Sequence, residues 1–171
     1  MSFLQRLFPE RKQRAALAPL YAAIVAESRD AVWYREGGVP DTIDGRFDMV
    51  AAVTALVLLR FEDEGEAGRI PAVLLTETFI DDMDATLRQI GIGDYVVGKH
   101  VGRMTGALGG RLAAFRDARP PASLADPVRR NIFHDSPPSE AALALVAARL
   151  ERLAVGLAAA GTDALMEGRL S

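Results

Sequence analysis

The sequence has no cysteine, few aromatic residues and no long hydrophobic run. Without cysteine the chain cannot form disulfide bonds or bind a metal through thiolates, which is typical of proteins in a reducing compartment. The longest uncharged apolar run, residues 49–59, is much shorter than the ~20 residues needed to cross a bilayer. The N-terminus lacks the apolar core of a signal peptide, so we expect a cytosolic protein.

The net charge is also small. A charge of −3 over 171 residues gives no reason to expect direct nucleic-acid binding. Alanine and leucine dominate, and the alternation of β-branched or aromatic residues that marks strands is scarce. We therefore predict an all-α fold, a single compact domain of about six to seven helices over residues 15–171, preceded by a separate segment at residues 1–14.

The strongest periodic pattern predicts a helical hairpin over residues 70–115. In its first helix apolar residues recur every three or four positions, with acidic residues on the opposite face. The apolar residues are Leu75, Phe79, Met83, Leu87 and Ile90. Pro71 suits a first helical turn. Gly91 can end this helix in the left-handed conformation and Asp94 can cap the next one, which predicts a tight corner between them.

The rest of the chain predicts further helices joined by loops. We expect helices at residues 19–35, 44–61 and 126–133, and a last one from a cap at Ser136 or Ser139 to Gly161. Residues 49–59 are apolar nearly all round, so their helix should be the buried centre. The acidic run 62–68 predicts a surface loop, and residues 116–138, with five of the nine prolines, predict a longer one.

Four acids lie close together in the predicted hairpin: Glu77, Asp81, Asp82 and Asp84. Carboxylates in pairs can hold a metal or transfer protons. Three of these acids share a polar face with Arg88, however, and a di-metal site in a bundle would need inward Glu-x-x-His pairs, which the sequence lacks. We interpret them as a solvated face. Asp82 is the exception, because it falls at the border of the apolar face.

No other set of residues points to catalysis. His100 and His134 have no third ligand at metal-binding spacing, and no serine occurs in a nucleophile elbow. The sequence has no phosphate loop and no glycine fingerprint. We expect no catalytic residue, metal or cofactor, and a carboxylate-based metal enzyme is the least favoured alternative.

Glycines recur every four residues in the second helix of the hairpin: Gly98, Gly102, Gly106 and Gly110. Each costs about 1 kcal/mol relative to alanine, which close approach of another helix can compensate. That helix belongs either to the same domain, which we favour, or to a partner that docks in a groove. The stretch is locally basic, with Lys99, Arg103, Arg111, Arg116 and Arg119. The candidate partner-binding residues are Asp82, Lys99, Gly102, Arg103, Gly106 and Arg111.

Residues 1–14 combine apolar and basic side chains. They are Phe3, Leu4, Leu7 and Phe8, with Arg6, Arg11, Lys12 and Arg14. This pattern is typical of a short anchor on an anionic membrane surface. The more ordinary interpretation is a frayed terminus whose apolar side chains pack against the body of the protein.

Several short motifs occur in order between residues 20 and 119. They are Leu20-Tyr21 with Ile24 and Arg29, Trp33-Tyr34, Val39-Pro40-Asp41-Thr42, Gly45-Arg46-Phe47-Asp48, Phe79 with Asp81-Asp82-Met83-Asp84, Leu87-Arg88, Gly91-Ile92-Gly93-Asp94, Lys99 and Gly110-Arg111. Together these motifs resemble the ubiquinol–cytochrome c chaperone family, the assembly factors of respiratory complex III. The segment from residue 120 onward carries no part of the resemblance.

The resemblance implies an all-α, non-enzymatic chaperone that binds newly made cytochrome b. Mitochondrial members act near the ribosome exit with a small partner protein, so these two are further candidate partners. Because the sequence lacks a transit peptide, it resembles a bacterial relative, and we expect it to act at the inner face of the cytoplasmic membrane. A membrane-surface adaptor with another client is the main alternative.

Overall fold

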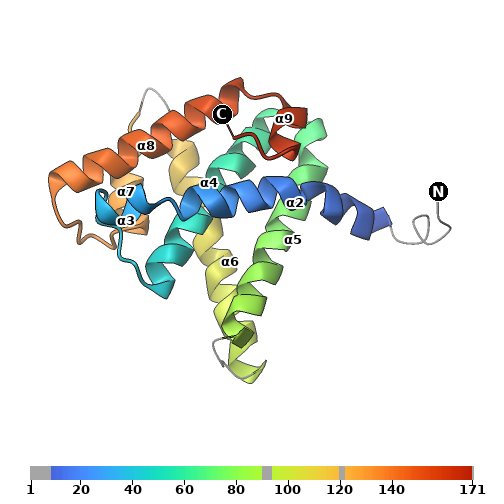
Figure 1. Ribbon diagram of the computed structural model, residues 1–171, viewed down its shortest axis with the longest axis horizontal. Helices are drawn as coiled ribbons and strands as arrows, with labels where there is room; N and C mark the ends of the chain where they lie inside the picture. The colour runs from blue at the N-terminus through green and yellow to red at the C-terminus, as the bar shows by residue number, and fades with distance from the viewer. Residues whose placement is uncertain (1–8, 90–93, 120–121, 171) are drawn as a thin grey trace.

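The helix at the centre of the fold is α4, Ile43–Asp63 (Figure 1). Every residue from Asp48 to Leu59 is buried, as the apolar run predicts. The computed structural model describes residues 9–89, 94–119 and 122–170. The described helices that pack most extensively on α4 are α2 (Pro9–Ser28), α5 (Glu66–Gln89), α6 (Asp94–Asp117) and α8 (Glu140–Ala159). The described residues form helices and no strand, so the predicted all-α fold is confirmed.

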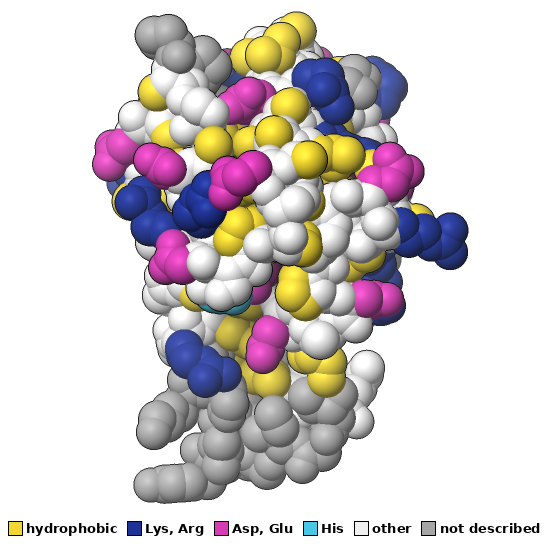
Figure 2. Space-filling view, turned by 90° about the vertical axis from the view of Figure 1, so that its left-hand side faces the viewer, with side chains coloured by type: hydrophobic (Ala, Val, Ile, Leu, Met, Phe, Trp, Pro, Cys, Tyr) yellow, Lys and Arg dark blue, Asp and Glu magenta, His cyan; other side chains and the backbone are white. Residues whose placement is uncertain are grey.

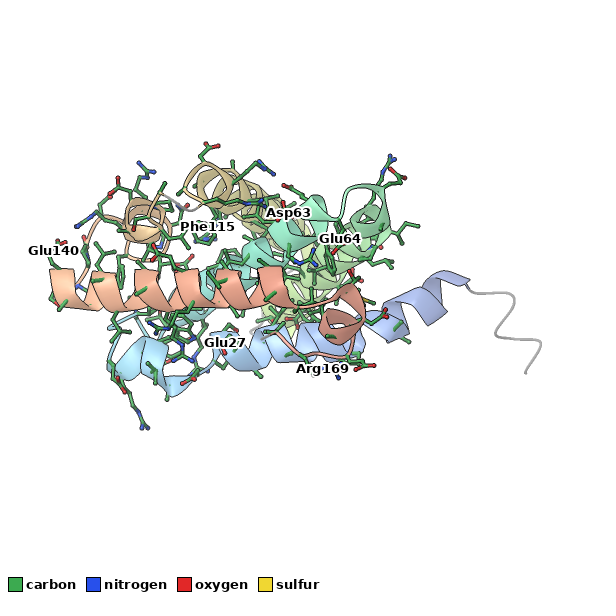
Figure 3. All side chains as sticks on the ribbon, turned by 90° about the horizontal axis from the view of Figure 1, so that it is seen from above. Glu27, Asp63, Glu64, Phe115, Glu140 and Arg169 are labelled. Carbon is green, nitrogen blue, oxygen red and sulfur yellow. The ribbon has the colours of Figure 1, made fainter. Side chains whose placement is uncertain are left out.

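The described part of the chain also contains three short helices. They are α3 (Ala31–Arg35), α7 (Ala125–Asn131) and α9 (Thr162–Met166). The helix α7 packs on α6 and α8, and α9 packs on α2. In Figure 1 the α5–α6 hairpin projects from one side of the body while α8 lies across the opposite side. Seen from above, α8 lies in front of the other helices, and Phe115 of α6 lies in the interior behind it (Figure 3).

The first helix differs from its prediction at both ends. It begins at Pro9, and Pro19 lies inside it instead of opening it. The helix continues through Pro19 because Leu17, Leu20 and Ile24 on either side are fully buried in the core, and this packing outweighs a missing hydrogen bond. The predicted end at residue 35 is also wrong, because the chain breaks after Ser28.

The connection between α4 and α5 is much tighter than the predicted loop over residues 62–68. Only residues 64 and 65 lie between the two helices, so Pro71 falls inside α5 and not in its first turn. The small Gly68 permits this turn, because a β-carbon there would lie 1.8 Å from the carbonyl oxygen of Phe61. The start of α5 therefore packs directly on the end of α4.

The C-terminal half follows its prediction closely. Ser139 caps α8 by accepting a hydrogen bond from the Ala142 amide at 3.0 Å. The apolar face of α8 is buried as expected, through Val146, Leu150, Leu153 and Leu157. The predicted corner at residues 91–94 lies largely outside the described residues. Over the part of the chain that the structure describes, no helix combines the length and apolarity that a bilayer crossing requires.

Candidate functional site

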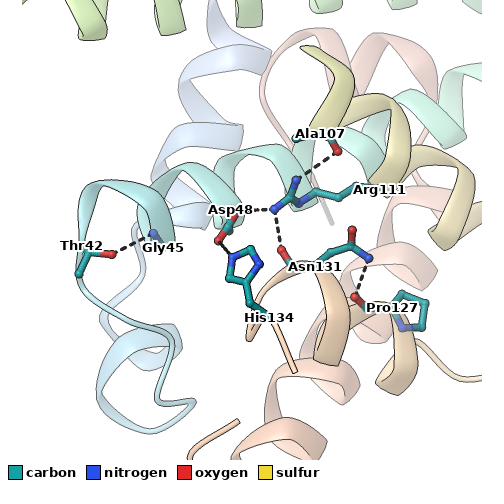
Figure 4. A network of polar contacts seen from close by, with 8 residues as sticks. All are labelled: Thr42, Gly45, Asp48, Ala107, Arg111, Pro127, Asn131 and His134. Carbon is teal, nitrogen blue, oxygen red and sulfur yellow. Dashed lines mark hydrogen bonds and ion pairs between the residues drawn. The ribbon is translucent and has the colours of Figure 1, made fainter. Parts of the chain in front are cut away.

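A buried polar cluster joins α4, α6 and the end of α7 (Figure 4). Asp48 and Arg111 are 4% and 3% exposed, and their carboxylate and guanidinium form an ion pair. The guanidinium of Arg111 also donates to the backbone oxygens of Asn131 at 2.6 Å and Ala107 at 3.1 Å. The second carboxylate oxygen of Asp48 lies 2.8 Å from Nε2 of His134. Three segments distant in the sequence thus meet at one point.

The local sequence around Asp48 fixes where its helix begins. Thr42 caps α4 by accepting a hydrogen bond from the Gly45 amide at 3.1 Å. Gly45 is needed because a β-carbon at this position would lie 2.0 Å from the carbonyl oxygen of Pro40. This capped, closely packed start places Asp48 in the second turn of α4, on the side that faces Arg111.

The electrostatics of the cluster reflect its burial. Desolvation raises the pKa of the Asp48 carboxyl and lowers the pKa of the Arg111 guanidinium, although their mutual attraction acts in the opposite direction. The guanidinium also lies 5.5 Å from the centre of the Phe47 ring, and its Nε atom has no hydrogen-bond partner. Removing one partner of such a buried ion pair leaves an uncompensated buried charge, which is strongly destabilising.

An open cavity of about 420 Å³ lies beside this cluster, between α4, α6 and α7. Its apolar part includes Phe47, Met104 and Ala107, and its polar part includes Asp44, Arg103, Arg130 and His134. The imidazole of His134 is exposed over 65% of its side-chain surface. On the face shown in Figure 2, apolar side chains lie among charged groups of both signs.

No helix that the structure describes covers the glycine row of α6 at Gly102, Gly106 or Gly110. Gly102, Gly106 and Gly110 are exposed, and a β-carbon at any of them would meet no atom within 4 Å. Our favoured interpretation, in which this row receives a helix of the same domain, is therefore wrong for these three positions. The surroundings of Gly98 and Lys99 lie outside the described residues. The uncovered row borders the cavity, because Gly110 also lines it.

Asp82 and Arg111 both have partners inside the protein. Asp82 is half-buried and accepts a hydrogen bond of 2.7 Å from the hydroxyl of Tyr21, which joins α2 to α5. Burial, and then this hydrogen bond, raise the pKa of the Tyr21 phenol far above its usual value. Of the candidate partner-binding arginines of α6, Arg111 is buried, whereas Arg103 is exposed.

Two further arginines of the basic stretch connect α6 to the end of α4. Arg116 pairs with Glu62 and Arg119 pairs with Asp63, each with an N–O distance of 2.6 Å. The predicted membrane-contact residues Phe3, Leu4, Arg6, Leu7 and Phe8 lie outside the described residues. Arg11, Lys12 and Arg14 belong to the first turns of α2, where the side chains are not described.

The acidic face of α5 contains an ion pair between Asp84 and Arg88, with an N–O distance of 2.7 Å. Among the residues that the structure describes, no group of three or more His, Asp or Glu side chains is arranged to hold a metal ion. The cluster residues Asn131 and His134 were not among our predicted site residues. Their contacts lie 20 and 86 positions away in the sequence, and no local pattern marks such pairs.

These features describe an all-α protein in which a buried polar cluster, an exposed row of glycines on α6 and an open cavity adjoin one another. The model of the family described as ubiquinol-cytochrome C chaperone matches residues 35–171, and the chain therefore belongs to this family. It is a chaperone of respiratory complex III assembly. The family match includes α7 to α9, which lie beyond the stretch that carried our sequence resemblance.

A solved structure supports the same relationship. The crystal structure of the Cbp3 homolog from Brucella abortus is 29% identical to this chain and superposes with a TM-score of 0.76. The match covers 99% of this chain and 96% of that chain. A comparison with curated protein sequences finds no match.

Proposed function

We propose that the protein binds newly made cytochrome b and holds it for assembly into ubiquinol–cytochrome c reductase. The observation that carries this proposal is the uncovered glycine row of α6, in a protein that belongs to a family of assembly chaperones. A chaperone for a membrane protein needs a surface that fits apolar helices, and it needs no reactive groups.

The glycine row suits this role physically. Glycines inside a helix weaken it, and no helix of the described domain covers Gly102, Gly106 or Gly110 in return. A client helix that lies along the row approaches the α6 backbone closely, and its contacts with the row compensate for the weaker helix. Lys99 and Arg103 lie next to the row in the sequence and form the proposed charged edge of this surface.

Deletion of the gene is expected to lower assembled cytochrome b while unrelated membrane complexes stay intact. Without the chaperone, the apolar helices of the client stay exposed during assembly and are lost to aggregation or proteolysis. Haem-b absorption spectra and quinol oxidation rates of membranes from the deletion strain measure the effect. Normal values for both would refute cytochrome b as the client.

Gly102→Leu is expected to abolish capture of cytochrome b without lowering the melting temperature. The leucine side chain enters open space in the free protein but blocks the close approach of a client helix. The measurement is co-purification of cell-free translated cytochrome b together with a thermal melt. Ala144→Leu, at an exposed position of α8, is the matched control. A variant that captures cytochrome b normally would exclude the glycine row as the client surface.

We also propose that residues 1–14 bring the protein to anionic membranes, which raises its concentration near client helices. Full-length protein is expected to float with anionic liposomes at low salt, and a variant without residues 1–14 is not. Each basic residue near such a surface contributes about 1 kcal/mol, an attraction that weakens as salt rises. Flotation of both forms would place the membrane contact elsewhere.

A small partner protein and the ribosome are further proposed partners, on the basis of the family resemblance alone. Crosslinking in cells, followed by identification of the captured polypeptides, tests both together with the client. Recovery of cytochrome b without either of them would limit the proposal to the client.

A further inference from the structure

We propose that a small pocket between α4, α6 and α8 receives one uncharged apolar side chain, about the size of a benzene ring, from a partner polypeptide. This inference goes beyond the proposed function and does not depend on it, because the pocket lies on the side of α6 away from the glycine row. Phe115, which lines the pocket, follows Gly106 by nine residues, or about two and a half helical turns. A helix on the row and a side chain in the pocket can therefore bind at the same time.

The walls of the pocket are apolar. They are formed by side chains that are at most 5% exposed: Leu56, Leu59, Phe115, Leu124 and Leu157. Phe115 and a polar lining residue, Asp63, are labelled in Figure 3. The pocket opens at Val155 and Ala158 of α8, both of which are exposed, Val155 over 62% of its surface. A space with such walls offers water few hydrogen-bond partners, so an apolar group is favoured in it over water.

The guanidinium of Arg60, which lines the pocket, is held by the protein itself. It donates hydrogen bonds to the backbone oxygens of Leu157 at 2.9 Å and Ala160 at 3.0 Å. It also pairs with the carboxylate of Glu64 at the end of α4. Arg60 therefore joins α4 to the end of α8 and fixes the shape of this side of the pocket.

The other charged side chains described in the lining also have partners. Arg119 and Asp63 form an ion pair with an N–O distance of 2.6 Å. The carboxylate of Glu151 accepts hydrogen bonds from the Leu124 amide at 2.8 Å and the Ser123 hydroxyl at 3.0 Å. The described lining thus contains two arginines and two acids, and its charges balance. This arrangement matches an uncharged occupant.

The size of the pocket indicates a side chain and not a whole small molecule. Its volume is about 150 Å³, whereas small-molecule sites usually measure about 300–1,000 Å³. A cavity of about 150 Å³ in another protein binds benzene. An apolar pocket for one side chain, surrounded by polar groups, is the setting in which protein interfaces make their strongest contacts. The occupant that fits is therefore a phenylalanine, or a side chain of similar size, on the surface of a partner.

The first test is a titration of the full-length protein, with labelled leucine and valine methyl groups, followed by nuclear magnetic resonance. Toluene, benzoate and benzylammonium are the probes, because they share one ring and differ in charge. Toluene is expected to shift the methyl signals of Leu56, Leu59 and Val155 and to bind at least about tenfold more tightly than either ion, since an ion loses hydration on leaving water.

The second test asks whether a polypeptide can supply the ring. Two 16-residue helical peptides of alanine and glutamine are compared, identical except for a central Phe or Ala. The Phe peptide is expected to bind about tenfold more tightly, to shift the same methyl signals and to compete with toluene.

Ala158→Phe is expected to abolish binding of both toluene and the Phe peptide, because its own ring occupies the mouth of the pocket. Ala144→Phe places the same ring at an exposed position of α8 outside the pocket and should leave both interactions unchanged. Circular dichroism melts check that both variants fold like the wild-type protein.

Absence of these methyl shifts with toluene would overturn the inference, and so would equal binding of benzoate. Unchanged toluene binding by folded Ala158→Phe would place the site elsewhere and also overturn it. Binding of toluene without a preference for the Phe peptide would exclude a polypeptide side chain and indicate a site for a small apolar molecule.

Discussion

Arg111→Met is expected to lower the free energy of unfolding by about 3–5 kcal/mol, because it leaves the Asp48 carboxylate buried without its cation. Asp48→Leu should have a similar effect for the opposite reason, since the Arg111 guanidinium is then buried alone. Asp48→Leu combined with Arg111→Met is expected to be far less destabilising than either single change. Desolvation raises the pKa of Asp48 and lowers the pKa of Arg111, which means that burial opposes the charged form of both side chains. The leucine and methionine of the double variant do not carry this desolvation cost.

Chemical denaturation of the four proteins gives the coupling energy between the two positions. Arg46→Met is the control, because its ion pair with Asp41 is exposed at the surface and should contribute little. If the double variant loses as much free energy of unfolding as the two single variants lose together, the two side chains act independently. The description of the cluster as one coupled unit would then be wrong.

The sequence predicts the parts of the fold that depend on periodicity. The helix α4 and the α5–α6 hairpin follow from apolar residues at helical spacing, because burial of one continuous face selects a helix over any alternative. Two errors fall at Pro19 and in residues 62–68, where short-range signals predicted breaks, and a third falls after Ser28, where a break was not predicted. In the first two places, packing against the core overrides the local preference, through the neighbours of Pro19 and through the close contact of Gly68 with α4.

The candidate site is predictable only in part, for a different reason. The glycine row is visible in the sequence, but whether a helix covers it depends on where α2, α5 and α8 pack. The Asp48–Arg111–His134 cluster combines residues 63 and 86 positions apart, which only the folded chain brings together. The motifs behind the family resemblance also meet in space, Tyr21 with Asp82 and Asp48 with Arg111. Much of that resemblance therefore reflects contacts that hold α2 to α5 and α4 to α6.

Two glycine substitutions are expected to change stability in opposite directions. Gly68→Ala should lower the free energy of unfolding by about 3 kcal/mol or more, because its β-carbon would lie 1.8 Å from the Phe61 carbonyl oxygen and the backbone must move. Gly106→Ala should raise it by up to about 1 kcal/mol, because the new methyl group enters open space and alanine favours a helix.

Thermal melts of both variants and the wild-type protein, at several protein concentrations, measure these changes. Each kcal/mol is expected to shift the melting temperature by about 2–4 °C. A lower melting temperature for Gly106→Ala would mean that the row is already covered in solution, and a dependence on concentration would identify a second copy as the cover. A higher melting temperature means that the free protein keeps a destabilising glycine where alanine would fit. That result would support the proposed client surface, because in a complex a neighbouring helix would need the space that a side chain would fill.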